Sequence, residues 1–277
     1  MRFFDNSAIN RIYLHSALFG LSERSGDAFI FVFLLKAGLA LPIVFLSLAA
    51  IVLLRLVFRQ MVLPFARRFG IRPTLIVGIA IGALAYIPIG YVRDAGPTLI
   101  LFLVLIGLGD AFYWACFHAT SAKLGDVEAR GAQVSAVQVV YSMSSIIGPL
   151  LGGLLQVSAG PIFAFLFAGL MRLLSVWPLL STPNTKIDTS AQIDSKSKYF
   201  AAQVYFFDGF GNAAAGNAFS LALFITLGQS FQRFGLALAG AAMLGAVMGL
   251  GIGRLFDLGH YKWSTAIGMC AAGVYVI

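Results

Sequence analysis

Long apolar segments separated by short polar ones dominate the chain. A helix needs about 20 mainly apolar residues to cross a bilayer, and eight segments reach roughly that length. They are Arg11–Leu35, Leu39–Val62, Pro73–Val92, Thr98–Leu124, Ala132–Val157, Pro161–Leu180, Ala201–Leu227 and Phe234–Phe256. A ninth apolar segment, Trp263–Ile277, ends the sequence. The pattern predicts an all-α, polytopic membrane protein whose main partner is the lipid bilayer.

Composition supports this interpretation and narrows the chemistry. Of 277 residues, 60% are hydrophobic and 11% are charged, whereas a soluble domain carries about 25% charged residues. The net charge of +8 comes from dispersed residues that form no continuous stripe, so we expect no nucleic-acid partner. Cys116 and Cys270 lie in apolar segments without a Cys or His partner at ligand spacing. We therefore expect no metal site and no cofactor.

Basic residues gather on one side of the predicted membrane. If the N-terminus faces the cytoplasm, fourteen Lys and Arg residues fall on that side and three on the other. Positively charged loops stay in the cytoplasm, so we expect a cytoplasmic N-terminus in a plasma membrane, with a bacterial inner membrane favoured. The polar segment 183–200 is then a cytoplasmic linker between a six-helix bundle, 1–182, and a partial second bundle, 201–277.

Self-comparison indicates an internal duplication. Gly26–Phe29 matches Gly216–Phe219, and Gly38 matches Gly228, all at an offset of 190 residues. The loop 67–72 matches 257–262 at an offset near 189. Two matches at nearly one offset predict a repeat of six spans with both copies in the same orientation, an arrangement that occurs in transporters.

The loop after the second span resembles a motif of the major facilitator superfamily. In that family the loop reads Gly-x-x-x-Asp-x-x-Gly followed by basic residues. Here the first copy lacks the acid, and the second copy keeps it one residue closer to the following Gly. The residues assigned to the motif are Gly70, Arg72, Gly253, Arg254 and Asp257. In the family such loops form a cytoplasmic charge cluster that stabilises one access state. Because the first copy lacks the acid, we expect its cluster to be weaker or to use Asp126 or Glu128 instead.

Segment 144–153 resembles the family's Gly-x-x-x-Gly-Pro-x-x-Gly-Gly signature, which is associated with exporters that work as antiporters. Ser144 stands in place of the first Gly. Small residues allow close helix approach and Pro permits a kink, so we expect a pivot at a helix crossing, with plain packing as the competing interpretation. The pivot residues are Gly148, Pro149, Gly152 and Gly153. The family has twelve spans, so we expect this sequence to be a fragment or a truncated copy.

Four of the eleven acidic residues fall well inside predicted spans: Glu23, Asp27, Asp110 and Asp208. An ionised side chain at the bilayer centre costs at least about 2.5 kcal/mol, so such residues usually serve a function. These four lie on the first, fourth and seventh spans, which the resemblance implies line a central cavity. We therefore predict a binding site for substrate and protons in the middle of the membrane.

Helical spacing groups the candidates into three faces. Glu23 and Asp27 form the first, Asp110 shares the second with Trp114 and His118, and the third combines Asp208, Asn212 and Gly216. The complete set is Glu23, Arg24, Asp27, Asp110, Tyr113, Trp114, His118, Arg172, Asp208, Asn212 and Asn217. We expect His118 to be a hydrogen-bonded residue near the helix end rather than a proton relay. Arg172 would bind an anionic substrate or pair across the bundle.

The ion pairs within this set allow two interpretations. In the functional one, Arg24 pairs with an acid such as Asp110, and another acid carries a proton, because burial disfavours the ionised form of a carboxyl group. In the structural one, the charges only lock helices together.

The sequence predicts a secondary transporter that moves a small organic solute by alternating access, is coupled to protons and favours export. The first alternative is a non-transporting receptor or scaffold derived from a transporter. The second is an intramembrane aspartyl protease, because Gly107–Asp110 spells Gly-x-Gly-Asp. That class also needs a Tyr-Asp motif, which this sequence lacks, so we expect no enzyme.

Overall fold

The computed structural model describes residues 6–126, 130–186, 199–200, 203, 216–257, 262 and 266. Every element in this part of the chain is a helix. Six of these described helical segments are long and apolar enough to cross a membrane: Leu41–Phe69, Ile71–Ile89, Pro97–Leu124, Gln133–Ser158, Pro161–Leu180 and Phe231–Gly249. The predicted all-α membrane fold is confirmed.

The first span is a single helical rod with a different turn in its middle. It comprises α1 (Ser7–Ser22), the π-helical turn η1 (Glu23–Asp27) and α2 (Ala28–Lys36). The side chain of Asn6 caps the start of α1 by accepting the backbone N–H groups of Ala8 and Ile9, as residues at helix N-caps do. Single π-helical turns inside α-helices are frequent at functional sites.

The remaining helices follow the predicted spans with shifted ends. They are α3 (Leu41–Phe69), α4 (Ile71–Leu84), α5 (Tyr86–Ile89), α6 (Pro97–Leu124), α7 (Arg130–Ser158), α8 (Pro161–Leu174), α9 (Val176–Leu180), α11 (Phe219–Thr226) and α12 (Phe231–Asp257). The largest error concerns α3, which runs to Phe69 although hydropathy ended the span at Val62. Arg67 and Arg68 are exposed good helix formers that continue the helix beyond its apolar part.

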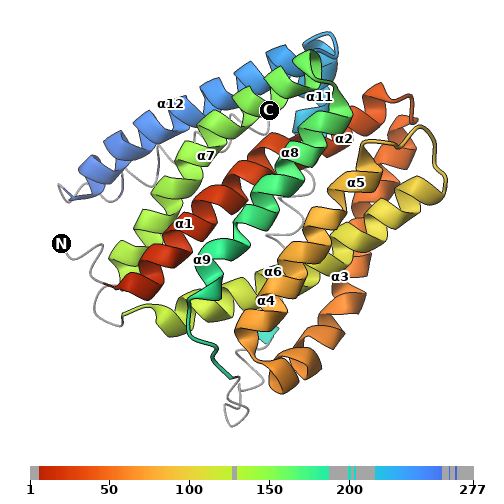
Figure 1. Cartoon of the computed structure of the whole chain (residues 1–277). Helices are drawn as coiled ribbons and strands as arrows, with labels where there is room; N and C mark the ends of the chain where they lie inside the picture. The colour runs from red at the N-terminus through yellow and green to blue at the C-terminus, as the bar shows by residue number, and fades with distance from the viewer. Residues whose placement is uncertain are drawn as a thin grey trace.

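Figure 1 shows the helices packed side by side, from α12 at one edge of the bundle to α3 at the other. Helix α12 lies along α7, α7 packs against α1, α1 against α8, and α8 against α4. Helix α6 packs between α4 and α3 on the far side. The α4–α6 contact is close because a Cβ atom at Gly109 would lie 2.5 Å from the backbone N of Gly82. Both glycines therefore serve helix packing.

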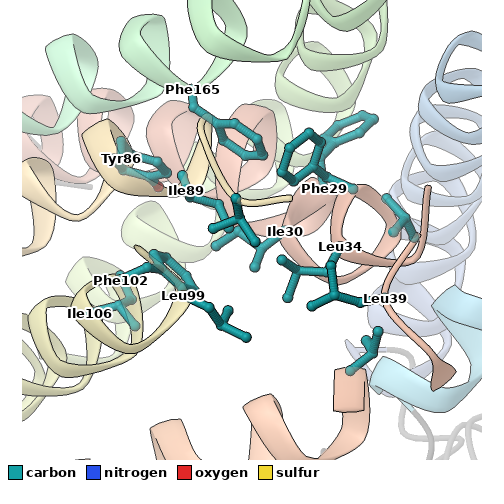
Figure 2. Close-up of a cluster of buried hydrophobic side chains, with 14 of the residues drawn as sticks. Phe29, Ile30, Leu34, Leu39, Tyr86, Ile89, Leu99, Phe102, Ile106 and Phe165 are labelled. Carbon is teal, nitrogen blue, oxygen red and sulfur yellow. The ribbon is translucent and has the colours of Figure 1, made fainter. Parts of the chain in front are cut away.

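Two hydrophobic clusters fill the bundle, one toward each end. One combines residues of α2, α5, α8 and the start of α6, including Phe29, Tyr86, Phe102 and Phe165 (Figure 2). The other combines α1, the start of α4 and the end of α6 around Phe19. Glu23, Asp27, Asp110 and Arg172 belong to neither cluster, and by position along their helices they lie between the two. We call these four residues the charged layer.

Basic side chains hold the loops at one end of the bundle, which we call the basic end. Arg11 donates to the carbonyl of Ser181, and Lys123 donates to the carbonyl of Lys186. These contacts tie α1 and α6 to the segment after α9. The bias of Lys and Arg toward one side of the membrane stays a prediction.

The two predicted repeats share local structure where both are described. Helices α3 and α12 begin at Leu41 and Phe231, 190 residues apart. The turns before them contain Gly38 with φ 98° and Gly228 with φ 71°, a conformation that favours glycine. Residues 216–218 have π-helical hydrogen bonding, as η1 has in the first copy. This correspondence supports the predicted duplication.

Some predicted segments fall outside the described residues. They include most of the linker 183–200, the first part of the seventh span and nearly all of Trp263–Ile277. The division into bundles 1–182 and 201–277 therefore stays a prediction.

Candidate functional site

A cavity of about 400 Å³ opens beside the first span. Its polar wall consists of Glu23, Arg24 and Asp27 from η1 together with Asn217 and Ser220. Its apolar wall consists of Ala28, Phe31, Val32 and Leu238. The two π-helical segments of the repeats therefore face one cavity, and Asp27 and Asn217, which occupy equivalent positions, both line it. The size lies within the range of small-molecule sites.

Arg172 of α8 connects two of the acids behind this wall. Its Nη2 lies 3.4 Å from Oδ2 of Asp27 and 3.6 Å from Oδ1 of Asp110. The Arg172 side chain is only 2% exposed. The hydroxyl of Tyr86 donates to Oδ1 of Asp27 at 2.5 Å. We call Asp27, Asp110, Arg172 and Tyr86 the Arg172 cluster, which joins the first span to α5, α6 and α8.

The sequence makes room for this guanidinium. A Cβ atom at Gly82 would lie 2.7 Å from Nη1 of Arg172, so a larger residue of α4 would displace the group. The rings of Phe19 and Tyr86 lie 4.7 and 5.5 Å from the guanidinium carbon, within the range of cation–π attraction. Two carboxylates and two aromatic rings therefore contact Arg172, and the missing side chain at Gly82 leaves space for its guanidinium group.

The predicted partner of Asp110 was wrong. The ion pairs of Asp110 within the described part of the chain are with Arg172 and with Arg55, whose Nη1 lies 3.9 Å away. Arg24 instead lines the cavity. The reason is packing, because α6 lies beside α4, and α4 packs on α8, which carries Arg172.

Glu23 differs from the other two acids of the charged layer. No hydrogen bond or ion pair joins its carboxylate to another residue in the described ranges, although it lines the cavity. Asp27 has both Tyr86 and Arg172 as partners. Of the two acids that line the cavity in the described part of the chain, Glu23 is therefore the one without a competing partner.

The aromatic face of α6 packs inside the bundle instead of lining the cavity. Tyr113 is buried and stacks on Phe19 with ring centroids 3.8 Å apart. Its hydroxyl lies 3.1 Å from Nε2 of His15, whose Nδ1 is 2.8 Å from the carbonyl of Ser175. Trp114 stacks on His118, which is exposed. In the described structure these three predicted residues do not belong to the cavity wall.

The glycines of α7 divide between two neighbouring helices. A Cβ atom at Gly148 would lie 2.4 Å from Cβ of Arg24, and one at Gly152 would lie 2.5 Å from the carbonyl O of Ser25. On the other side, a Cβ atom at Gly153 would lie 2.7 Å from the carbonyl O of Phe231. Helix α7 is therefore in backbone contact with the first span and with α12 at the same depth.

The Pro149 carbonyl belongs to the contact with α12. A Cβ atom at Gly235 would lie 2.3 Å from the carbonyl O of Pro149. Gly153 and Gly235 thus form a crossing of α7 and α12 without side chains between the backbones.

Gly70 and Arg72 hold the α3–α4 turn against the segment after α9. Gly70 has φ 95°, which permits the sharp turn. Arg72 donates from Nη1 to the carbonyls of Leu180 and Thr182 at 3.0 and 2.6 Å. The suggestion that Asp126 serves this loop was wrong, because Asp126 instead accepts from Asn6 and Gln133 near the start of α7.

Several predicted site residues lie outside the part of the chain that the structure describes. Asp208, Asn212 and Glu128 lie outside the described residues, as do the side chains of Arg254 and Asp257. Gly253 and Arg254 belong to the last turns of α12. No group of acidic, His and Cys residues that could hold a metal ion occurs in the described part of the chain.

Comparison with known families adds the decisive observation. The model of the Major Facilitator Superfamily matches residues 28–277. The chain belongs to the major facilitator superfamily. No curated protein sequence matches it. As a member of this superfamily it is an integral membrane protein of a transporter family that is generally non-enzymatic, and the resemblance predicted from the motifs is confirmed.

Sequence reasoning missed three residues in this facilitator-family chain: Tyr86 and Arg55, which contact acids of the charged layer, and His15, which contacts Tyr113. His15 and Tyr86 are polar residues inside apolar spans, a signal that was present in the sequence. Arg55 is 41% exposed, yet its side chain also approaches Asp110. Its partner becomes visible only once α3 is packed on α6.

Proposed function

We propose that this protein is a proton-coupled secondary transporter that moves a small organic solute by alternating access, with export as the favoured direction. The observation that carries the proposal is the cavity lined by both repeats and backed by the charged layer. Charged side chains at this depth are costly unless they serve transport or a structural lock. The proposed location is a plasma membrane, with the basic end in the cytoplasm.

The Arg172 cluster supports the proton-coupling part of the proposal. One buried guanidinium faces two carboxylates, Asp27 and Asp110. The cluster carries one negative charge in excess when both acids are ionised, apart from the half-exposed Arg55. Protonation of either acid would make the cluster neutral. Arg172 would then pair with the acid that stays ionised, so uptake or release of one proton would shift its ion pair between the first span and α6.

The crossing of α7 and α12 supports the alternating-access part. Backbones meet there at Gly153 and Gly235 without interlocking side chains. Packed side chains make interfaces bistable instead of continuously adjustable, whereas smooth backbone surfaces let one helix rock on another. Export is proposed from the resemblance of segment 144–153 to the signature of antiporters.

The proton-coupling proposal is tested by flux in proteoliposomes with an imposed pH gradient. Asp27→Asn, Asp110→Asn and Asp208→Asn each remove one carboxyl group at nearly constant volume. We expect at least one of these variants to lose gradient-driven flux while retaining exchange without a gradient. Unchanged gradient dependence in all three would remove the proton carrier from the proposal.

The rocking proposal is tested by a pair of glycine variants on one helix. Gly235→Ala adds a methyl group 2.3 Å from a backbone carbonyl, whereas Gly240→Ala meets no atom within 4 Å. We expect Gly235→Ala to reduce flux by at least about tenfold through overpacking and Gly240→Ala to leave it unchanged. Equal flux in both variants would show that this crossing does not move.

The competing functions make different predictions. A receptor or scaffold would bind a ligand but show no flux under any gradient. A protease of the Gly-x-Gly-Asp class is disfavoured by packing. Gly107 lies against Leu54, Gly109 against Gly82, and Asp110 against Arg172, so all three residues of the motif have structural contacts.

A further inference from the structure

The cavity wall carries two adjacent and opposite charges, Glu23 and Arg24, on one π-helical turn. We propose that the cavity binds a zwitterion: a small molecule with a cationic amine, an anionic carboxylate and an apolar body. This inference rests on the proposed transport function and names the class of its solute.

Glu23 is the acceptor for the amine. Glu23 lines the cavity, and its carboxylate has no hydrogen bond or ion pair with the residues that the structure describes. The second acid of the wall, Asp27, is already bound to Tyr86 and Arg172. An ammonium group would therefore gain more from Glu23 than from Asp27, because hydrogen bonds between two charged groups are about twice as strong as neutral ones.

Arg24 is the donor for the carboxylate. Successive residues on a helix do not face each other, so the side chains of Glu23 and Arg24 leave the helix in different directions, and both line the cavity. Gly148 fixes the origin of the Arg24 side chain, since a Cβ there would lie 2.4 Å from the Cβ of Arg24. The side chain then lines both this cavity and a neighbouring one of about 600 Å³. No ion pair in the described ranges neutralises it.

A solute with a single charge fits this wall less well. A simple amine would neutralise Glu23 and leave the guanidinium of Arg24 facing the solute, and a simple carboxylate would leave Glu23 facing it. Binding such a solute would remove water from the second charge without supplying a counter-charge, which is unfavourable. A zwitterion satisfies both groups without changing the net charge of the cavity.

The rest of the wall defines the body of the solute. Phe31, Val32 and Leu238 contribute an apolar part of the lining, and Asn217 and Ser220 add neutral hydrogen-bonding groups. A volume of about 400 Å³ suits a molecule of the size of a large amino acid better than a peptide or a lipid.

The test measures binding to the purified full chain in lipid nanodiscs by isothermal titration, without a pH gradient. The probes are phenylalanine, phenethylamine and 3-phenylpropanoate, which share one body and differ in charge, and the matching series leucine, 3-methylbutylamine and 4-methylpentanoate. We expect one zwitterion to bind at least about tenfold more tightly than either singly charged analogue, as the loss of one charge-assisted contact implies.

Two variants assign the charges. Glu23→Gln should abolish the preference for the zwitterion over the carboxylate analogue, and Arg24→Gln should abolish its preference over the amine. Arg93→Gln is the matched control, because Arg93 contacts only the backbone carbonyls of Gly90 and Val92 among the described residues. Each variant is accepted only if its melting temperature without ligand equals that of the wild type.

Three outcomes would overturn the proposal: tighter binding of an amine, tighter binding of a carboxylate, or no binding in either series. Unchanged selectivity in Glu23→Gln and Arg24→Gln would do the same. Failure of the transport proposal is distinguishable, because zwitterion binding without gradient-driven flux refutes transport alone. Conversely, gradient-driven flux of an amine alone refutes the zwitterion and leaves transport intact.

Discussion

The Arg172 cluster and the Glu23–Arg24 wall lie next to each other and treat charge in opposite ways. In the cluster each acid has a partner from another helix, and Arg172 is only 2% exposed. On the wall, neighbouring residues of one turn carry opposite charges, and neither makes a hydrogen bond or an ion pair through its side chain in the described part of the chain. The comparison teaches that a charged side chain inside a membrane protein can either hold helices together or bind a solute. Whether it has an ion-pair partner on another helix distinguishes the two roles.

Arg172→Gln should have the largest effect on stability. The change leaves Asp27 and Asp110 without their cation, and breaking a buried ion pair costs about 3–5 kcal/mol. We expect a large drop in melting temperature in detergent and a low yield. Asp27→Asn and Asp110→Asn added to Arg172→Gln should restore most of the loss. A triple variant no more stable than Arg172→Gln would show that charge does not explain the role of Arg172.

Tyr86→Phe should have the next largest effect. It removes the hydroxyl that donates to Asp27 at 2.5 Å, and a hydrogen bond to a charged group contributes about 1.5–3 kcal/mol. The measurement is the melting temperature in the wild type and in an Asp27→Asn background. The loss should shrink in that background, and an equal loss in both would place the effect of Tyr86 in its ring packing.

Arg55→Gln tests how much the second cation near Asp110 contributes to stability compared with Arg172. Arg55 approaches Asp110 at 3.9 Å but is 41% exposed, and exposed ion pairs contribute about 0.2–1 kcal/mol. We expect a small decrease in stability that disappears at high salt. A loss as large as that of Arg172→Gln would contradict the distinction between buried and exposed partners.

Glu23→Gln should have the smallest effect on stability. Because no described residue pairs with its carboxylate, we expect a change within about 0.5 kcal/mol, as for substitutions away from specific contacts. The same variant should have the strongest effect on amine recognition. A large loss of stability would show that Glu23 belongs to the structural charges.

Much of the fold follows from hydropathy, since the long apolar helices α6, α7 and α8 begin within two residues of their predicted positions. The partner of Asp110 could not be predicted from hydropathy. Arg172 is 62 residues away in the sequence, and only the packing of the helices brings the two side chains together. The π-helical turn was also unpredicted. The turn spans only five residues, Glu23–Asp27, and no pattern of apolar residues distinguishes such a turn from an ordinary α-helical one.

The distance in sequence between Asp27 and Arg172 has a consequence for synthesis. The two residues are 145 positions apart, and at 5–20 residues per second a ribosome needs on the order of 7–30 s to cover that interval. During this time the first span carries an acid without its later cation. Until α8 emerges, the charge of Asp27 would have to be solvated by water or by polar groups outside this chain, because an uncompensated charge in the membrane is costly.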